Sequence, residues 1–369
     1  MAELKTVKEP LFHIVKKSNI TTKKAWIIRT IAIFSAFIFV AVLSWIALGI
    51  SPINFVKNVF IGAFGNNNTL NLFREVSILL LIALAVTPAF KMKFWNIGAE
   101  GQTLVSALTA YGCIFYLGDK LPSVLVIFIM LILSVSAGII WAVIPAIFKA
   151  KWNTNETLFT LMMNYVATQL VILMTAVWAT NGSGSLSALR SVILPKIGGD
   201  EYWFAIIVAV LVTALMFIYL KYTKQGYEIS VVGESEKTAK YVGIGVKKVV
   251  IRTLVLSGAI CGITGVILVA GKNHVVNTDI VCGYGFTAIL VSWLAKFNPI
   301  FMIFTSFMVL FLTHGTSQVM SSVQVANNFF AEVVVGIVFL AIIACEFFIV
   351  YSIKKNKRVK NTSTKEDKK

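Results

Sequence analysis

Two apolar stretches of the chain carry polar side chains at the spacing of one helical face. Their amide and hydroxyl groups donate and accept hydrogen bonds, but they provide no activated nucleophile and no set of metal ligands. In an apolar bundle, such side chains either line a hydrated pathway for a polar solute or join neighbouring helices. The two stripes are Gln102, Ser106 and Thr109, and Thr160, Asn164 and Thr168.

The first stripe follows a segment of unusual composition, residues 94–102, with the sequence FWNIGAEGQ. Gly98 and Gly101 allow close approach of another backbone. Asn96 and Glu100 can accept hydrogen bonds from the free amides at the start of a helix. The segment therefore predicts either part of a solute path or a structural network where a helix begins.

The sequence lacks the motifs of common catalytic sites. It has no G-x-x-x-x-G-K-[ST] loop and no H-E-x-x-H motif, so hydrolysis of a nucleotide by a phosphate-binding loop is excluded. The four cysteines contain no close pair, which indicates neither a disulfide framework nor a metal site. They are Cys113, Cys261, Cys282 and Cys345. We expect a protein that performs no covalent chemistry and binds no metal or cofactor of its own.

Ionisable residues inside the apolar stretches are few. Glu100 and Glu332 lie near the ends of stretches, and Glu346 lies deeper in the last one. Of the three histidines, only His314 falls within a stretch. Ion-coupled carriers usually place ionisable residues at mid-depth, so this composition argues against a proton- or sodium-driven carrier.

The apolar stretches are long enough to cross a membrane. Of 369 residues, 58% are hydrophobic and only 13% are charged, whereas a soluble domain has roughly a quarter charged residues. The stretches do not alternate, so helices are the expected spanning element. We predict an all-α polytopic membrane protein with ten spans, near residues 25–50, 71–90, 97–117, 122–148, 157–179, 203–221, 249–270, 284–296, 300–318 and 329–352. The eighth is short and predicts either a full crossing or a broken or re-entrant helix.

The net charge of +17 follows this topology. With ten spans and both termini in the cytoplasm, most basic residues of the connections fall on the cytoplasmic side, as the positive-inside rule requires. The other side receives only Lys57, Lys120, Arg190, Lys196 and Lys272. Topology thus explains the charge without nucleic acid as a partner, and contact of the basic termini with anionic membrane lipid is a secondary expectation. The predicted parts are a basic arm (1–24), a transmembrane domain (25–352) and a basic tail (353–369).

One polar connection is longer than a turn between two helices requires. Residues 221–248 lie between two apolar stretches and include the mixed-charge run 234–240, which predicts a short surface helix. The charge pattern places this loop in the cytoplasm. A structured element in water predicts a docking site for a soluble partner.

Several segments together resemble the permease subunits of ATP-binding-cassette (ABC) importers for nucleosides and simple sugars. Residues 96–102, NIGAEGQ, are similar to the family signature N-I-G-[GA]-E-G-Q. Further similar segments follow in the family's order: Asn155-Glu156, residues 161–165 (LMMNY), residues 232–244, residues 283–289 (GYGFTAI) and Asn298-Pro299. The resemblance is strongest to the nucleoside-importing branch. Ser235 stands where the family usually has Asn.

The resemblance implies an assembly at the cell membrane. The chain would act with a second homologous permease, with an ABC ATPase that binds ATP and Mg²⁺, and with an extracytoplasmic substrate-binding lipoprotein that delivers a nucleoside. Loop 221–248 would contain a coupling helix seated on the ATPase, begun by Ser235 and ended by Gly243. The residues expected to couple to the ATPase are Gly233, Glu234, Ser235, Ala239, Tyr241 and Gly243.

A second set of residues is expected along the solute path: Asn96, Glu100, Gln102, Asn164, Thr168, Phe286 and His314. A structural role remains the alternative for each, as a bond between helices or as packing. Gly258, Gly262 and Gly265 predict close packing of helices. For the whole chain, the alternatives are an ABC permease for a ribose-like sugar or another small polar solute, and an ion-coupled secondary transporter.

Overall fold

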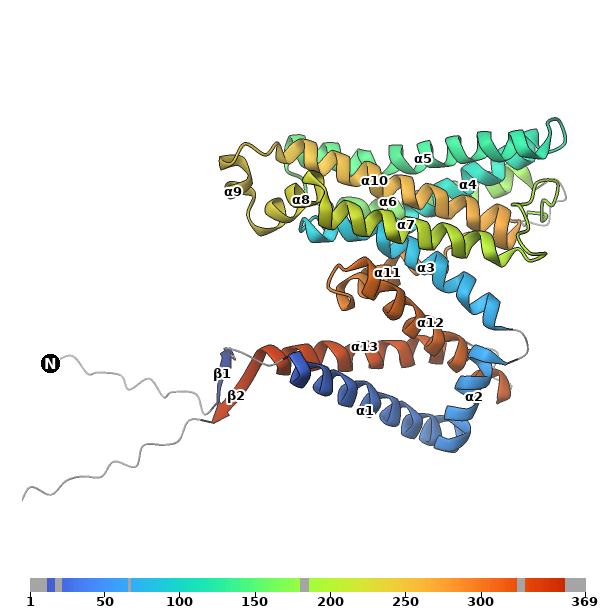
Figure 1. Cartoon of the computed structure of the whole chain (residues 1–369). Coiled ribbons are helices and arrows are strands. Elements are labelled where there is room, and N and C mark those ends of the chain that lie inside the picture. Colours follow the sequence, from blue (N-terminus) through green and yellow to red (C-terminus); the bar gives the residue numbers. More distant parts are fainter. Residues whose placement is uncertain (1–11, 17–21, 66–67, 180–185, 324–328, 356–369) are drawn as a thin grey trace, which may run out of the picture. The chain divides into compact units, whose positions relative to one another are not determined.

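The computed structural model describes residues 12–16, 22–65, 68–179, 186–323 and 329–355 (Figure 1). The chain forms two compact units. Unit 1 combines Met1–Val56 with Asn327–Lys369, and unit 2 is Lys57–Ala326. Most of the predicted basic arm and tail lies outside the described residues, so the division into arm, domain and tail stays a prediction.

Unit 1 is a helix pair with a short β-ribbon. Helix α1 (Thr22–Leu48) packs against α13 (Phe329–Val350). Strand β1 (Phe12–Lys16) pairs antiparallel with β2 (Tyr351–Lys355), and Ile14 lies opposite Ile353. The predicted all-α class therefore needs one addition, this two-stranded ribbon, in which pairing satisfies the backbone groups of the segments next to the helices.

Unit 2 is helical, and α10 is its central element, packed chiefly against α5, α4 and α3. Helix α2 (Pro52–Phe64) begins in unit 1 and lies mostly in unit 2. The other helices are α3 (Asn68–Lys91), α4 (Ala99–Leu117), α5 (Ser123–Trp152), α6 (Glu156–Trp178), α7 (Tyr202–Tyr222), α8 (Lys224–Glu234), α9 (Glu236–Tyr241), α10 (Val246–Leu268) with its π-helical extension η1 (Val269–Asn273), α11 (Tyr284–Leu294) and α12 (Pro299–Ser322).

Six helices among the described residues are long and apolar enough to cross a membrane, or seven if Phe34–Leu48 and Pro52–Phe64 form one broken span. The structure therefore shows a nearly all-helical, polytopic chain. The count of ten spans and the cytoplasmic location of both termini stay predictions.

Helix α2 was not expected from the sequence. Pro52 is its first residue, a position where the fixed φ of proline favours a helix. Its unit 2 part packs on α12, because an added Cβ at Gly62 would meet Gln318 Cβ at 2.5 Å. The rings of Phe60 and Phe311 pack edge to face at 5.4 Å. Packing against α12 thus stabilises a helix in a segment that the sequence predicts to be a connection between spans.

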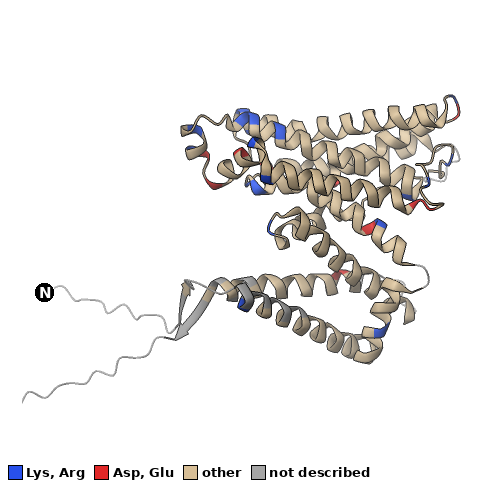
Figure 2. Ribbon diagram, in the orientation of Figure 1, with Lys and Arg blue, Asp and Glu red and all other residues tan. Residues whose placement is uncertain are grey.

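Lys and Arg residues gather at the end of unit 2 that contains α8 and α9 (Figure 2). We call this the basic end, and it includes the last turns of α3, α5 and α7. The opposite end, the loop end, contains residues 186–201. There, Leu194 N donates to Ala270 O (3.1 Å) and Leu189 N donates to His274 O (2.8 Å). These bonds fix η1 at the loop end.

Three glycines of α10 allow backbone-to-backbone packing at the centre of unit 2. An added Cβ at Gly258 would collide with the carbonyl oxygen of Gly138 in α5. At Gly262 it would lie 2.5 Å from an α5 backbone atom, and at Gly265 it would lie 2.6 Å from the backbone nitrogen of Ala107 in α4. A side chain at any of the three would push α10 away from its neighbours.

The stretch predicted as the eighth span, residues 284–296, is helical over α11 (Tyr284–Leu294), and an irregular segment, residues 275–283, precedes it. This segment follows η1 after His274, and α11 begins beside Glu75, two turns into α3. Ser292 of α11 meets Thr87, one turn before α3 ends (2.8 Å). Eleven helical residues extend only about 16 Å, and residues 275–283 before them are not helical. Within a membrane, irregular backbone is stable only where protein buries it or where it lines a hydrated cavity.

Candidate functional site

The side-chain amides of Asn96 and Gln102 belong to one buried hydrogen-bond network. Asn96 Nδ2 donates to Ser257 Oγ (3.2 Å), and Asn96 Oδ1 accepts from Gly98 N (3.1 Å) and Gln102 Nε2 (3.3 Å). Ser257 in turn donates to Gln102 Oε1 (3.1 Å). All of these side chains are buried. The network joins α10 to the start of α4, which favours the structural role for Asn96 and Gln102, and contact with solute stays a prediction.

Asn164 makes the matching link from α6 to α4. Its Oδ1 accepts from Gly101 N (2.9 Å) and its Nδ2 donates to Ile97 O (2.9 Å). An added Cβ at Gly101 would lie 2.8 Å from Asn164 Oδ1, so the glycine makes room for the amide. Thr168, one turn further along α6, is half-buried, and its hydroxyl donates a hydrogen bond to Asn164 O (3.1 Å).

Asn164→Leu is expected to destabilise unit 2. The variant leaves Gly101 N buried without its partner, at about 1–3 kcal/mol, and also removes the partner of the part-buried Ile97 O. Thr168→Val is the matched control, because that hydroxyl bonds only within its own helix. Thermal unfolding of the detergent-solubilised protein should show a clear drop in melting temperature for Asn164→Leu alone. Equal drops for both variants would contradict a linking role for Asn164.

The carboxylate of Glu100 binds the start of α11. Its two oxygens accept from Gly283 N (3.1 Å) and Gly285 N (2.6 Å). The free amides of a first helical turn carry the positive end of the helix dipole, so a carboxylate there is stabilising. Glu100 therefore attaches α11 to α4, and it caps another helix instead of its own.

A second carboxylate at the start of α11 was missed in the sequence. Glu75 of α3, 6% exposed, forms an ion pair with Lys272 Nζ of η1 (2.6 Å) and accepts from Tyr284 OH (2.7 Å). The two adjacent charges Arg74 and Glu75 inside stretch 71–90 were the available signal. Lys272, assigned by sequence to an outer connection, lies largely buried against α3. The buried charge is thus greater than the sequence suggested, but it is paired.

The remaining predicted pathway residues take no part in these hydrogen bonds. Phe286 of α11 is exposed (44%). His314 of α12 is half-buried. Trp293 of α11 packs against Trp95 with ring centroids 5.4 Å apart. Asn96, Glu100, Gln102 and Asn164 therefore all bond the first turns of α4 to other helices, Thr168 bonds only within α6, and no hydrogen bond joins Phe286 or His314 to these residues in the described part of the chain.

A cavity of about 680 Å³ opens at the loop end of unit 2, between α6 and the irregular segment before α11. Its volume is in the range of small-molecule sites. Polar groups come from Thr175, Asn277 and Thr278, among apolar neighbours. No sequence pattern marked these residues, because the helix break that exposes them is a tertiary feature. The other lining residues are Ile172, Ala176, Leu186, Val275 and Val276.

Helices α8 and α9 form a structured projection at the basic end. Ser235 Oγ accepts from Thr238 N (3.2 Å) and caps α9. Gly243 has a φ of +81°, which suits the left-handed turn after the helix. Gly233 and Ala239 are buried, and a Cβ at Gly233 would collide with Lys91 O. These two residues position the projection.

Three residues of the predicted set, Glu234, Tyr241 and Gly243, lie on the outward face of the projection. Tyr241 is 93% exposed. The adjacent Val242, which was not in the predicted set, is 60% exposed. Tyr241 and Val242 together give the projection an exposed apolar tip.

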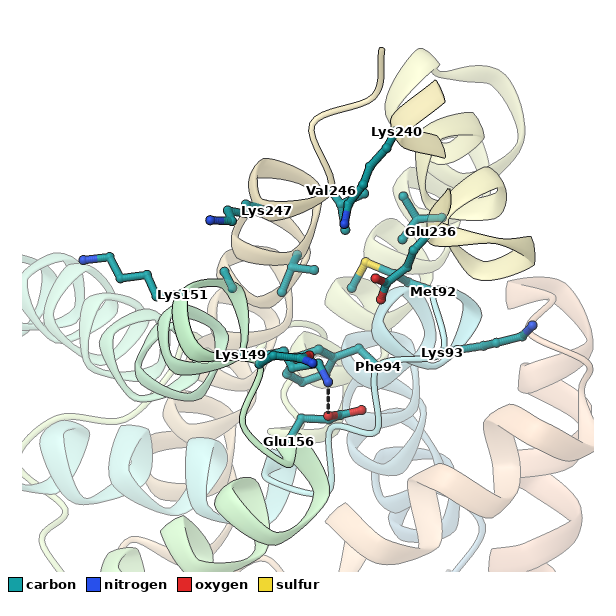
Figure 3. Close-up of a pocket in the computed structure, with 14 residues that line it drawn as sticks. Met92, Lys93, Phe94, Lys149, Lys151, Glu156, Glu236, Lys240, Val246 and Lys247 are labelled. Carbon is teal, nitrogen blue, oxygen red and sulfur yellow. Dashed lines mark ion pairs between the residues drawn. The ribbon is translucent and has the colours of Figure 1, made fainter. Parts of the chain in front are cut away.

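A pocket of about 370 Å³ separates α9 from the corner between α5 and α6 (Figure 3). Lys149 and Glu156 form an ion pair at that corner (2.8 Å). Glu236 and Lys240 of α9 point toward the pocket from the other side (Figure 3). The pocket is lined by residues of the projection and by residues at the ends of α3, α5, α6 and α10. The projection therefore lies close to the ends of four long helices.

Long apolar helices, a cavity at the loop end and a structured projection at the basic end are features that suit a membrane transport subunit. Residues 68–343 match the family described as the branched-chain amino acid transport system permease component. The chain belongs to this permease family, and it is a multi-pass cell-membrane protein and a transport component, not an enzyme.

Three relatives are ABC transporter permeases. A nucleoside permease of Lactococcus lactis is 27% identical over 361 residues, 93% of this chain and 96% of the relative. A glucose permease of Haloferax volcanii is 28% identical over 327 residues, 84% of each chain. A guanosine permease of Bacillus subtilis is 30% identical over 231 residues, 60% of this chain and 65% of the relative. No solved structure matches the chain.

Proposed function

We propose that this chain is a permease subunit of an ABC importer for nucleosides. The observation that carries the proposal is the likeness, over nearly the whole of both chains, to the nucleoside permease of Lactococcus lactis. The guanosine permease of Bacillus subtilis supports the same solute class. The cavity of about 680 Å³, with its few polar groups among apolar walls, suits a solute with an aromatic base and hydroxyl groups.

In this proposal the basic end faces the cytoplasm and the loop end faces outward. A substrate-binding lipoprotein delivers the nucleoside at the loop end, and the path runs along the exposed face of α6 against a second, homologous permease. An ATPase, which holds ATP and Mg²⁺, seats on the α8–α9 projection through Tyr241 and Val242. Nucleotide-driven motion of the projection then moves α10 and its neighbours as a rigid body.

A simple sugar is the second candidate solute, since the glucose permease of Haloferax volcanii is about as similar. Uptake measured in cells that lack this chain, with and without the chain restored, separates the two. We expect restored uptake of labelled guanosine, inhibited by excess unlabelled nucleoside and insensitive to glucose or ribose. Restored uptake of the sugar alone would overturn the nucleoside proposal and leave the permease role intact.

A further inference from the structure

We propose that Glu75 and Lys272 are positioning residues for transport, whose ion pair joins the outer end of α10 to α3 and, through Tyr284, to the start of α11. Movement of α10 that begins at the α8–α9 projection would thereby displace the start of α11. The inference rests on the proposed function, because it needs an ATPase that moves the projection.

The first step is the continuity of α10. The helix begins at Val246, a few residues after α9 ends at Tyr241, and continues through η1 to Asn273. Its glycines hold it in backbone contact with α5 and α4. Because close-packed interiors resist compression, we expect a displacement of α10 to carry α5 and α4 with it. Lys272 therefore places a charge at the far end of an element whose near end adjoins the projection.

The second step is the way in which α11 is held. Tyr284, its first residue, donates to Glu75 (2.7 Å), and the amides of Gly283 and Gly285 donate to Glu100 (3.1 and 2.6 Å). The preceding irregular segment lines the outer cavity through Val275, Val276, Asn277 and Thr278. A shift of Lys272 and Glu75 thus reaches the segment that borders the cavity.

The third step concerns the cost of the pair. The side chains of Lys272 and Glu75 are only 13% and 8% exposed. Removal of one partner from a buried pair leaves an uncompensated charge, whereas replacement of both by uncharged residues of similar size is often neutral for stability. A double replacement can therefore remove the connection and keep the fold, which separates positioning from packing.

The test uses the assembled transporter in proteoliposomes and the double variant Glu75→Gln/Lys272→Met. Its matched control is Lys196→Met/Glu201→Gln, another ion pair of the loop end (2.8 Å). The hydrogen bond from Lys196 lowers the pKa of the Glu201 carboxyl. Cys282, the exposed thiol among the described cysteines, reports on the segment before α11 by its rate of maleimide labelling, followed by mass spectrometry.

We expect the double variant to keep its melting temperature and basal ATP hydrolysis while uptake falls roughly 5- to 150-fold, the usual range of allosteric coupling. Labelling of Cys282 should change with ATP in the unaltered transporter and the control, and should stop changing in the double variant. Normal uptake with ATP-dependent labelling in the double variant would overturn the proposal. ATP-independent labelling in the unaltered transporter would do the same.

If the double variant does not fold, the variant Tyr284→Phe provides the test, because it removes one hydroxyl and keeps the ion pair. Unchanged uptake in that variant would overturn the connection to α11. Reduced uptake with a normal melting temperature would support the connection. If the unaltered assembly shows no ATP-dependent uptake of nucleoside, the proposed function fails, and the labelling measurement still reports whether ATP moves the segment.

Discussion

Gly258→Ala is expected to disrupt unit 2, although it adds a single methyl group. The new Cβ would collide with Gly138 O, a backbone atom that cannot turn aside. Overpacking of a tight interior costs about 1–3 kcal/mol and occasionally more. The atoms that meet at this contact belong to the backbones of α10 and α5, so no side-chain rotation can relieve the collision. We expect a large loss of folded protein and a lower melting temperature in detergent.

The control for this prediction is Gly336→Ala in α13. An added Cβ there meets nothing within 4 Å, so the change should be neutral or stabilising by up to about 1 kcal/mol, through the better helix propensity of alanine. Size-exclusion profiles after stepwise heating compare the two variants directly. Identical profiles would mean that α5 and α10 do not depend on this glycine contact.

Tyr241→Ala is expected to abolish most transport while the fold is retained. The side chain is 93% exposed at the end of α9, so the described part of the chain gives it little packing to lose. Aromatic anchors at protein interfaces often contribute 2 kcal/mol or more, which corresponds to more than tenfold in affinity. The ATPase should therefore co-purify poorly with the variant, and uptake should fall accordingly.

Tyr222→Ala is the matched control, since Tyr222 is also at the basic end and is 68% exposed, but it ends α7 and is not part of α9. Co-purification of the ATPase and uptake should both remain close to those of the unaltered chain. If the ATPase binds the Tyr241 variant as well as the control, the docking surface is not the tip of α9.

The local features of this fold could be predicted from the sequence because their causes are local. A serine before a short charged run predicts a helix cap, and Ser235 does cap α9. Glycines at helical spacing predict a close helix contact, and α10 meets α5 and α4 there. Helical spacing likewise puts Gln102 and Ser106 on one face of α4 and Thr160 and Asn164 on one face of α6, and all four side chains are buried.

The function of those stripes could not be predicted, because it depends on their partners in other helices. Asn96 and Asn164 are polar residues of the kind that can line a solute path, yet their side-chain amides are hydrogen-bonded to Ser257, Ile97 and Gly101. The pairing of Glu75 with Lys272 is likewise a contact between residues far apart in the sequence. The irregular segment before α11 borders the cavity at the loop end, and carboxylates from α3 and α4 bind the helix start that follows it. No pattern within the segment itself predicts this arrangement.

Uptake of labelled guanosine into proteoliposomes is the most direct test of the central claim, that this chain is a nucleoside permease driven by ATP. The vesicles would contain this chain, its partner permease and its ATPase, with ATP enclosed and the loaded binding protein outside. We predict uptake that requires enclosed ATP and continues when ionophores dissipate the proton and sodium gradients. Uptake that proceeds without ATP and stops with the ionophores would contradict the account.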